Sequence, residues 1–356
     1  VLVSACALIV GFLKRNFELR DPSGVNRPLR IRFLLMVLGM AVLVFLGSLV
    51  IFPILPRANW AVMGSAAIET GYTESIKLQD SSAVWSEGVP RTLVELWLPD
   101  NLPWERVIPF GLLRGKALEI FDANGWRPSA KQIATSRDAA GDVYVEAVRE
   151  AMPTEILPVP YGEIFVESGN RKAVQYRSGE WLVSLRRGQQ ISYRFYLPAK
   201  TGNNGRVRGE DFPRDVHLRI PPGFQKLRAL GEKLARENQS LSARFEALKR
   251  QFSAFEASTD AVEIISEGEN PEEKFFFETK RGHCELFASS AAILFRSMGI
   301  PARLVAGFRL SREPKNGVVV FRNHDAHAWV EFWTEKNGWV PYDPTPIIRI
   351  LVVAGS

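Results

Sequence analysis

The chain has 356 residues and a formal net charge of +6, and 24% of its residues are charged. This length allows roughly two domains and a sizeable hydrophobic core. No long run of lysine and arginine with interleaved aromatic residues follows the N-terminal region, so a nucleic-acid partner is not expected. Of the two cysteines, Cys6 lies in an apolar segment far from Cys284, which excludes a disulfide framework.

Residues 1–57 have the pattern of a membrane region. Residues 1–13 are apolar and uncharged but too short to cross a bilayer, so we interpret them as the tail of a truncated membrane helix. A basic loop follows over 14–32. Phe33 to Leu55 then runs without a charge, and as a helix this run is about 34 Å long, which is enough to cross. A buried core helix is the alternative, and it fits less well because the run has no polar face.

The basic loop 14–32 sets the expected orientation of this region. Positively charged loops stay on the cytoplasmic side, so everything after Pro56 is expected outside the cytoplasm. We therefore predict a protein of the cell (inner) membrane, multi-pass in its full length. Its partner there is the lipid bilayer, through Phe33–Leu55, and its globular part is extracytoplasmic.

Residues 58–220 are predicted to form a β-rich extracytoplasmic domain. Apolar and polar residues alternate along Thr92–Leu98, Asp142–Val148 and Gln190–Leu197, as expected for half-buried strands. Segments rich in Asn, Gly and Asp separate these runs and indicate turns. No acid–base pair, metal-ligand spacing or phosphate-binding loop stands out, so a structural or substrate-presenting sandwich is expected.

Residues 221–350 are predicted to form a core that begins with helices. Leucine and phenylalanine recur at helical spacing within Pro221–Phe255, which predicts two amphipathic helices, and a short helical turn is expected over Glu272–Thr279. After residue 300, Arg303–Phe308 and Gly317–Arg322 resemble two strands.

One helix of this core begins at Cys284. Apolar side chains follow it with the spacing of one buried stripe, at positions 287, 288, 291, 292, 295 and 298. Gly282 permits a sharp turn before this helix, and Gly299 closes it. The thiol thus lies in the first helical turn, where the helix dipole and the free N–H groups favour the thiolate. A small core cysteine without chemistry is the alternative.

A reactive thiol needs a base, and four histidines are available. His283 is a poor choice because side chains of neighbouring helical residues point about 100° apart. His217 lies in a β segment without polar neighbours and is expected at the surface, as is His324. His327 lies in a strand between two alanines, where a helix end can approach. It is therefore the candidate base for Cys284.

The base in turn needs a carboxylate that fixes its tautomer, and Asp343, at the end of the next strand, is the candidate. A two-residue turn at Asn337–Gly338 would pair Asp343 with Phe332, on the wrong face and about 17 Å from His327. A wider loop over Thr334–Gly338 would pair residues 327 and 343 directly. The catalytic interpretation therefore predicts the wider loop.

A zinc site made by His324, His327 and Cys284 is the alternative use of these atoms. Two histidines three residues apart on a strand point to opposite faces, and no fourth ligand with short spacing is evident. No metal and no cofactor are therefore expected.

Four motifs stand in a characteristic order and spacing: Arg-Gly-His-Cys-Glu-Leu-Phe-Ala (281–288), Gly-Ile-Pro-Ala-Arg (299–303), Asp-Ala-His-Ala-Trp (325–329) and Asp-Pro-Thr (343–345). Together they resemble the transglutaminase-like superfamily, in particular its bacterial membrane-anchored branch, in which an extracytoplasmic region of uncertain function precedes the core. The resemblance covers about 270–346, and a looser one covers 91–130. It implies a fold related to papain-like cysteine enzymes, with Cys284 as nucleophile, His327 as general base and Asp343 as its orienting partner.

The expected fold class is α+β. A papain-like or transglutaminase-like core, with the cysteine helix packed on an antiparallel sheet, follows the β-rich domain and an N-terminal transmembrane segment. The expected function is a membrane-tethered cysteine enzyme that forms a thioester with a peptide or protein amide and passes the acyl group to an amine or water. A cysteine peptidase or amidase of the same fold and a catalytically silent binding scaffold are the alternatives.

Overall fold

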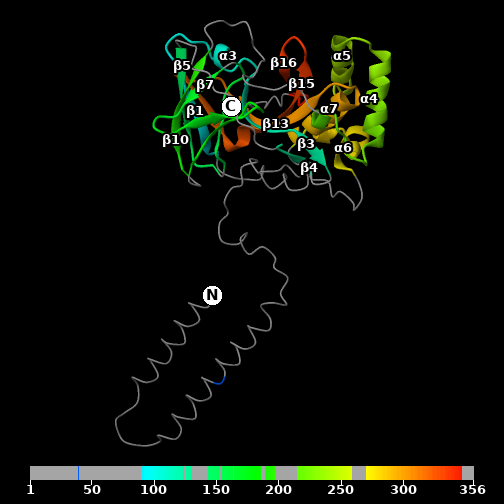
Figure 1. Cartoon of the computed structure of the whole chain (residues 1–356), viewed down its shortest axis with the longest axis horizontal. Coiled ribbons are helices and arrows are strands. Elements are labelled where there is room, and N and C mark those ends of the chain that lie inside the picture. The colour runs from blue at the N-terminus through cyan, green and yellow to red at the C-terminus, as the bar shows by residue number, and fades with distance from the viewer. Residues whose placement is uncertain are drawn as a thin grey trace, which may run out of the picture. The chain divides into compact units, whose positions relative to one another are not determined.

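The structure is a computed structural model that describes residue 39 and residues 90–346, apart from 123–124, 130–142, 153, 163, 186–188, 198–214 and 259–269 (Figure 1). The predicted membrane segments 1–13, 14–32 and 33–55 lie outside these residues, except for Gly39. Among the helices that the structure describes, none has both the length and the hydrophobicity needed to cross a bilayer. The described residues from 90 onward all belong to one compact unit, Ile68–Ser356.

A five-stranded antiparallel sheet forms the β-rich part of the chain, in the order β14-β1-β5-β10-β7. Its strands are β1 (Thr92–Trp97), β5 (Val143–Arg149), β7 (Phe165–Glu167), β10 (Ile191–Leu197) and β14 (Val318–Arg322). Buried and more exposed residues alternate along β5 and β10, so each of these strands has one face on the core and one toward solvent. The strands predicted from alternation at 92–98, 142–148 and 190–197 are therefore confirmed.

The second sheet has four antiparallel strands in the order β16-β15-β13-β2. They are β2 (Leu112–Leu118), β13 (Ala302–Arg309), β15 (Ala326–Thr334) and β16 (Gly338–Tyr342). Helix α7 (Cys284–Ser297) packs on β13 and β15, and α4 (Gln225–Glu237) packs on α7 (Figure 1). Together with α5 (Leu241–Gln251), these elements give the predicted α+β core, in which two leading helices precede a cysteine helix on an antiparallel sheet.

The remaining elements are short and connect or cover the two sheets. They are α3 (Trp104–Val107), β3 (Ile120–Asp122), β4 (Gly125–Arg127), β6 (Ile156–Leu157), β8 (Ala173–Gln175), β9 (Trp181–Val183), η3 (Asp215–His217), β11 (Glu256–Ala257), α6 (Pro271–Lys274), η4 (Phe275–Thr279), β12 (Arg281–Gly282) and η5 (Asn323–Asp325). The helical turn predicted over 272–279 corresponds to α6 and η4.

The two sheets exchange strands across residue 220, where the sequence suggests a division. Strand β2 comes from the region 58–220 but pairs with β13, whereas β14 comes from the region 221–350 but pairs with β1. The predicted strands 303–308 and 317–322 thus both exist, as β13 and β14, although they belong to different sheets. Because of this exchange, part of the β-rich region lies directly beside the core sheet.

Helix α7 is buried along almost its whole length, because the sheet lies on one side and helices lie on the other. Every residue from Cys284 to Arg296 is buried. The neighbouring helix α4 comes closest at Gly231, where a Cβ atom would lie 2.3 Å from the Cβ of Ser297. Glycine is required there because the two helix backbones approach too closely for a side chain. The position of Cys284 at the start of α7 is therefore well fixed.

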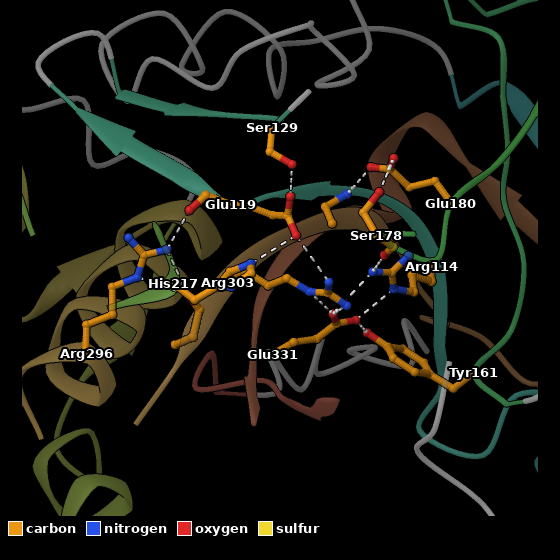
Figure 2. Close-up of polar contacts among 12 residues, drawn as sticks. Arg114, Glu119, Ser129, Tyr161, Ser178, Glu180, His217, Arg296, Arg303 and Glu331 are labelled. Carbon is orange, nitrogen blue, oxygen red and sulfur yellow. Dashed lines mark hydrogen bonds and ion pairs between the residues drawn. The ribbon is translucent and has the colours of Figure 1, made fainter. Parts of the chain in front are cut away.

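A buried ionic cluster, which consists of Glu331, Arg114, Arg303 and Glu119, links strands β15, β2 and β13 of the second sheet (Figure 2). Glu331 on β15 is fully buried, and it pairs with Arg114 at 2.8 Å and with Arg303 at 2.6 Å. Burial alone would raise the pKa of Glu331, but the two guanidinium groups outweigh it and lower the pKa to about 2. Glu331 is therefore ionised at neutral pH.

The prediction that His217 lies at the surface is wrong. Its side chain is buried, and its Nε2 lies 2.9 Å from Oε1 of Glu119 (Figure 2). Its ring also packs edge-on against Trp339, with 4.8 Å between the ring centroids. Glu119 is 98 positions away in the sequence. The residues around His217 therefore give no local sign of the polar partner that makes its burial possible.

Candidate active site

Cys284 is the first residue of α7, as the sequence predicts. The helix runs to Ser297 and is followed by Gly299, whose φ of 76° is typical of a residue that closes a helix. The role of Gly282 differs from the expected one of permitting a sharp turn. A Cβ atom there would lie 2.8 Å from Cδ1 of Leu286 and 2.9 Å from the ring of Phe275. Glycine is needed at this position because the backbone passes closely between those two side chains.

The thiol of Cys284 is buried against the beginning of β15. Its sulfur accepts a hydrogen bond from the backbone N–H of Ala328, the residue that follows His327. Burial raises the pKa of the Cys284 thiol far above its ordinary value, the Glu285 carboxylate adds to this, and the Ala328 N–H opposes it. The expectation that the helix N-terminus favours the thiolate is therefore wrong in direction, because loss of hydration dominates. The resting thiol is protonated at neutral pH and needs a base.

His327 lies on β15 and Asp343 directly follows β16, and the register between these strands differs from both predicted ones. The ladder between β15 and β16 ends where Val330 pairs with Tyr342. Continued by one residue, this register places Asp343 opposite Trp329, on the same face as His327 and one diagonal step away. The direct pairing of residues 327 and 343 was therefore the wrong prediction, although the two side chains do share a face.

The His327 and Asp343 side chains form a hydrogen bond, with 2.7 Å between Nε2 and Oδ2. Burial alone would raise the pKa of Asp343, but the charge and the hydrogen bond of His327, together with the charge of Arg309, lower it to about 2. The carboxylate can only accept a hydrogen bond, so Nε2 of His327 carries the hydrogen. This leaves Nδ1 as the ring nitrogen that can take up a proton.

Arg309, the last residue of β13, is a site residue that the sequence does not identify. Its Nη1 lies 2.9 Å from Oδ2 of Asp343 and 3.4 Å from the carbonyl oxygen of Thr345. The same Nη1 is 3.4 Å from Nε2 of His327, but both nitrogens are donors directed at the same carboxylate oxygen. Arg309 therefore holds Asp343 in place and keeps it ionised. The sequence hint is a charged residue at the end of a strand whose other residues, apart from Arg303, are apolar.

The other histidines stay apart from this group. His324 is exposed, as predicted. His283 is the N-cap residue of α7, and its Nδ1 lies 3.9 Å from Oε2 of Glu285. Among the residues that the structure describes, no three His, Cys, Asp or Glu side chains are arranged to hold a metal ion. The alternative zinc set of His324, His327 and Cys284 thus does not form.

The arrangement defines a class of protein: an α+β fold with a cysteine at the start of a buried helix and a histidine–aspartate pair on two strands of the adjoining sheet. Comparisons with known proteins agree. The family model of the transglutaminase-like superfamily matches residues 229–344. The crystal structure of the periplasmic domain of TgpA from Pseudomonas aeruginosa has a TM-score of 0.63 at 20% identity, covering 77% of this chain and 93% of that one.

Two curated proteins are similar over shorter segments. The chain is 33% identical to a protein-glutamine gamma-glutamyltransferase of Pseudomonas aeruginosa over 165 residues. This segment covers 45% of this chain and 25% of that protein. It is also 33% identical to the uncharacterized protein YebA of Bacillus subtilis over 139 residues. This segment covers 37% of this chain and 19% of that protein. The chain therefore spans about a quarter or less of the length of these relatives. Within the chain, residues 229–344 form a domain of the transglutaminase-like superfamily.

Proposed function

We propose that this protein is a membrane-tethered cysteine acyltransferase of the protein-glutamine gamma-glutamyltransferase type, which acts on glutamine amides of peptides or proteins. One observation carries the proposal: His327 forms a 2.7 Å hydrogen bond with Asp343, and the next residue, Ala328, binds the thiol of Cys284 through its backbone N–H. A carboxylate, an imidazole and a thiol in this order are the parts of an activated cysteine nucleophile. The similarity to the Pseudomonas glutamyltransferase supports the choice of amide substrate.

In the proposed reaction, Nδ1 of His327 takes the proton of the Cys284 thiol, and the sulfur attacks the amide carbonyl carbon. The negative oxygen is stabilised by backbone N–H groups at the N-terminal end of α7. His327 then gives its proton to the departing nitrogen, the C–N bond breaks, and a thioester remains. An amine or water attacks this thioester, His327 accepts its proton, and the released thiolate is protonated again.

The proposed location is the outer side of the cell membrane. The similar crystal structure is that of a periplasmic domain, which supports an extracytoplasmic catalytic domain here. The uncharged run Phe33–Leu55 and the basic loop 14–32 support an anchor whose positive flank is cytoplasmic. The lipid bilayer and a peptide or protein substrate are therefore the proposed partners.

Transfer and hydrolysis can be separated with one assay of the full chain. A glutamine-containing peptide is incubated with and without a fluorescent primary amine, and ammonia release and amine incorporation are both measured. Acyl transfer predicts ammonia release together with covalent incorporation of the amine, because the amine competes with water for the thioester. Ammonia without incorporation would indicate an amidase, and cleavage of the peptide backbone would indicate a peptidase. If no product forms at all, the proposed enzyme activity is contradicted.

The proposed His327–Cys284 pair makes a prediction that does not depend on the substrate. Because burial keeps the Cys284 thiol protonated, alkylation by iodoacetamide at pH 7 depends on proton transfer to His327. We expect His327→Ala to slow alkylation of Cys284 by about 10²-fold, the lower range for loss of a general base. Mass spectrometry of the labelled peptide measures the rate. Exposed His324 provides the matched control, since His324→Ala should leave the rate unchanged. Equal rates in the His327→Ala and wild-type proteins would contradict the pairing.

A further inference from the structure

The indole ring of Trp329 lies beside the imidazole of His327 on the same face of β15. The ring centroids are 6.3 Å apart and the ring planes differ by 22°. Trp329 is fully buried, and a Cβ atom at Gly307 would lie 2.6 Å from its ring. Gly307 is paired with His327 in the sheet, so the missing side chain gives the indole its place next to the imidazole. The position of Trp329 therefore bears directly on that of His327.

The indole is fixed at its far end by a residue from the β-rich region. Nε1 of Trp329 donates a hydrogen bond of 2.6 Å to the hydroxyl oxygen of Tyr161, which lies between β6 and β7. Burial raises the pKa of Tyr161 well above its ordinary value, and the nearby Glu331 carboxylate raises it further. The phenol therefore keeps its proton and is itself a donor.

The Tyr161 hydroxyl donates to Oε1 of Glu331, the centre of the buried ionic cluster (Figure 2). Glu331 is held by Arg114 and Arg303, both of which are fully buried. The directions of these hydrogen bonds are fixed, because the ionised carboxylate can only accept and the indole can only donate. The result is a rigid chain from the ionic cluster through Tyr161 to Trp329, and a chain of this kind leaves the indole one position.

We propose that Tyr161 is a positioning residue for the catalytic histidine: it fixes the Trp329 indole, which in turn keeps the His327 imidazole aligned between Asp343 and Cys284. This inference rests on the proposed function. Tyr161 lies outside residues 229–344, the part of the chain that matches the transglutaminase-like domain. The β-rich region would thus complete the active site of the core, and the core on its own would have a loosely held histidine.

The test replaces the Tyr161 hydroxyl alone, with Tyr161→Phe in the full chain. The ring keeps its edge-on packing against Phe110, at 5.6 Å between centroids, so the variant is expected to fold. We expect alkylation of Cys284 by iodoacetamide at pH 7 to slow by about 10- to 100-fold, the loss typical of a misplaced catalytic group. With a glutamine peptide, kcat should fall by a similar factor while KM stays within about twofold, since Tyr161 is buried and out of reach of a bound peptide.

Tyr193→Phe is the matched control. Tyr193 is also a buried tyrosine of the β-rich region, and its hydroxyl donates to a backbone carbonyl, that of Pro158, at 2.5 Å. This variant should lose comparable stability but keep the wild-type alkylation rate. If both variants slow equally, or if neither slows, Tyr161 has no positioning role and the inference is overturned.

A double-mutant cycle tests the route through Trp329. In Trp329→Phe, which lacks the Nε1 donor, adding Tyr161→Phe should change the alkylation rate by less than about twofold, because the link is already broken. Additive losses would overturn the inference. Failure of the proposed function looks different, because Cys284 would then react slowly in the wild-type protein and no faster than in His327→Ala. That result would remove both proposals, whereas a reactive wild-type thiol with an unaffected Tyr161→Phe variant would remove only this one.

Discussion

Replacing Cys284 by alanine is expected to reduce turnover of an amide substrate by at least about 10⁴-fold, because no other group in the proposed mechanism can form the thioester. The protein should stay folded. Alanine is the better helix former, and Cys284 begins a helix that is held by packing along its whole length. The loss of one buried sulfur should cost no more than about 1–2 kcal/mol in the free energy of unfolding.

Kinetic assays and thermal unfolding of the two proteins, measured side by side, check this expectation. Ser290→Ala is the matched control, because Ser290 lies in the same helix, is fully buried and also loses one polar atom on substitution to alanine. It should keep wild-type turnover. A cysteine with only a packing role would give the opposite pattern, in which Cys284→Ala unfolds more easily and retains activity.

The position of Cys284 could be predicted because it depends on local signals. Helical periodicity and a closing glycine define α7 within twenty residues, and the alternating pattern of β15 shows which residues share a face with His327. The state of the thiol could not be predicted in this way. Burial depends on every element packed around the helix, and it reversed the expected direction of the pKa.

The prediction of the register between His327 and Asp343 failed for a different reason, since this register depends on the geometry of one turn. The loop between β15 and β16 has three residues, between the paired Thr334 and Gly338. Gly338 has a φ of 70°, and the hydroxyl of Thr334 accepts the backbone N–H of Asn337. Such a turn lies between the two-residue and the wide loop considered from the sequence. The observed register differs from the predicted one by two residues, and side chains two residues apart on a strand point to the same face. The His327–Asp343 pair therefore forms although the predicted register was wrong.

The residues that the sequence did not identify are all polar groups with distant partners. Arg309 reaches Asp343, 34 positions away, His217 reaches Glu119, and Tyr161 reaches Trp329 across 168 positions. A single sequence contains no period or spacing that reports such pairs. The pair of Tyr161 and Trp329 also joins the two regions of the chain, which the pairing of β2 with β13 brings side by side.

Replacing Glu331 by glutamine is expected to destabilise the protein strongly. The substitution keeps the shape of the side chain but leaves the buried guanidinium groups of Arg114 and Arg303 without their shared carboxylate. Removing one partner of a buried ion pair costs about 3–5 kcal/mol, because the remaining charge stays out of water. For a protein of this size, the melting temperature should fall by about 4–8 °C.

Glu146→Gln is the matched control for this loss. Glu146 forms a 2.7 Å pair with Arg194 on the solvent face of the five-stranded sheet, where both side chains are about half exposed. An exposed pair of this kind contributes little, so the control should melt with the wild-type protein. Equal melting temperatures for all three proteins would show that the buried ionic cluster does not hold the sheet together.

The pH dependence provides a second measure of the same charge. The pKa of Glu331 is lowered from an ordinary value near 4.5 to about 2 in the folded protein, so its carboxylate stabilises the fold fully above about pH 4.5. This contribution is lost as the pH falls toward 2, because the carboxylate becomes protonated in the folded protein as well. The glutamine variant never has it. The difference in melting temperature between the wild-type protein and Glu331→Gln should therefore become smaller as the pH falls from 4.5 to 2. A difference that stays constant over this range would mean that the variant is weakened by lost packing and not by lost charge.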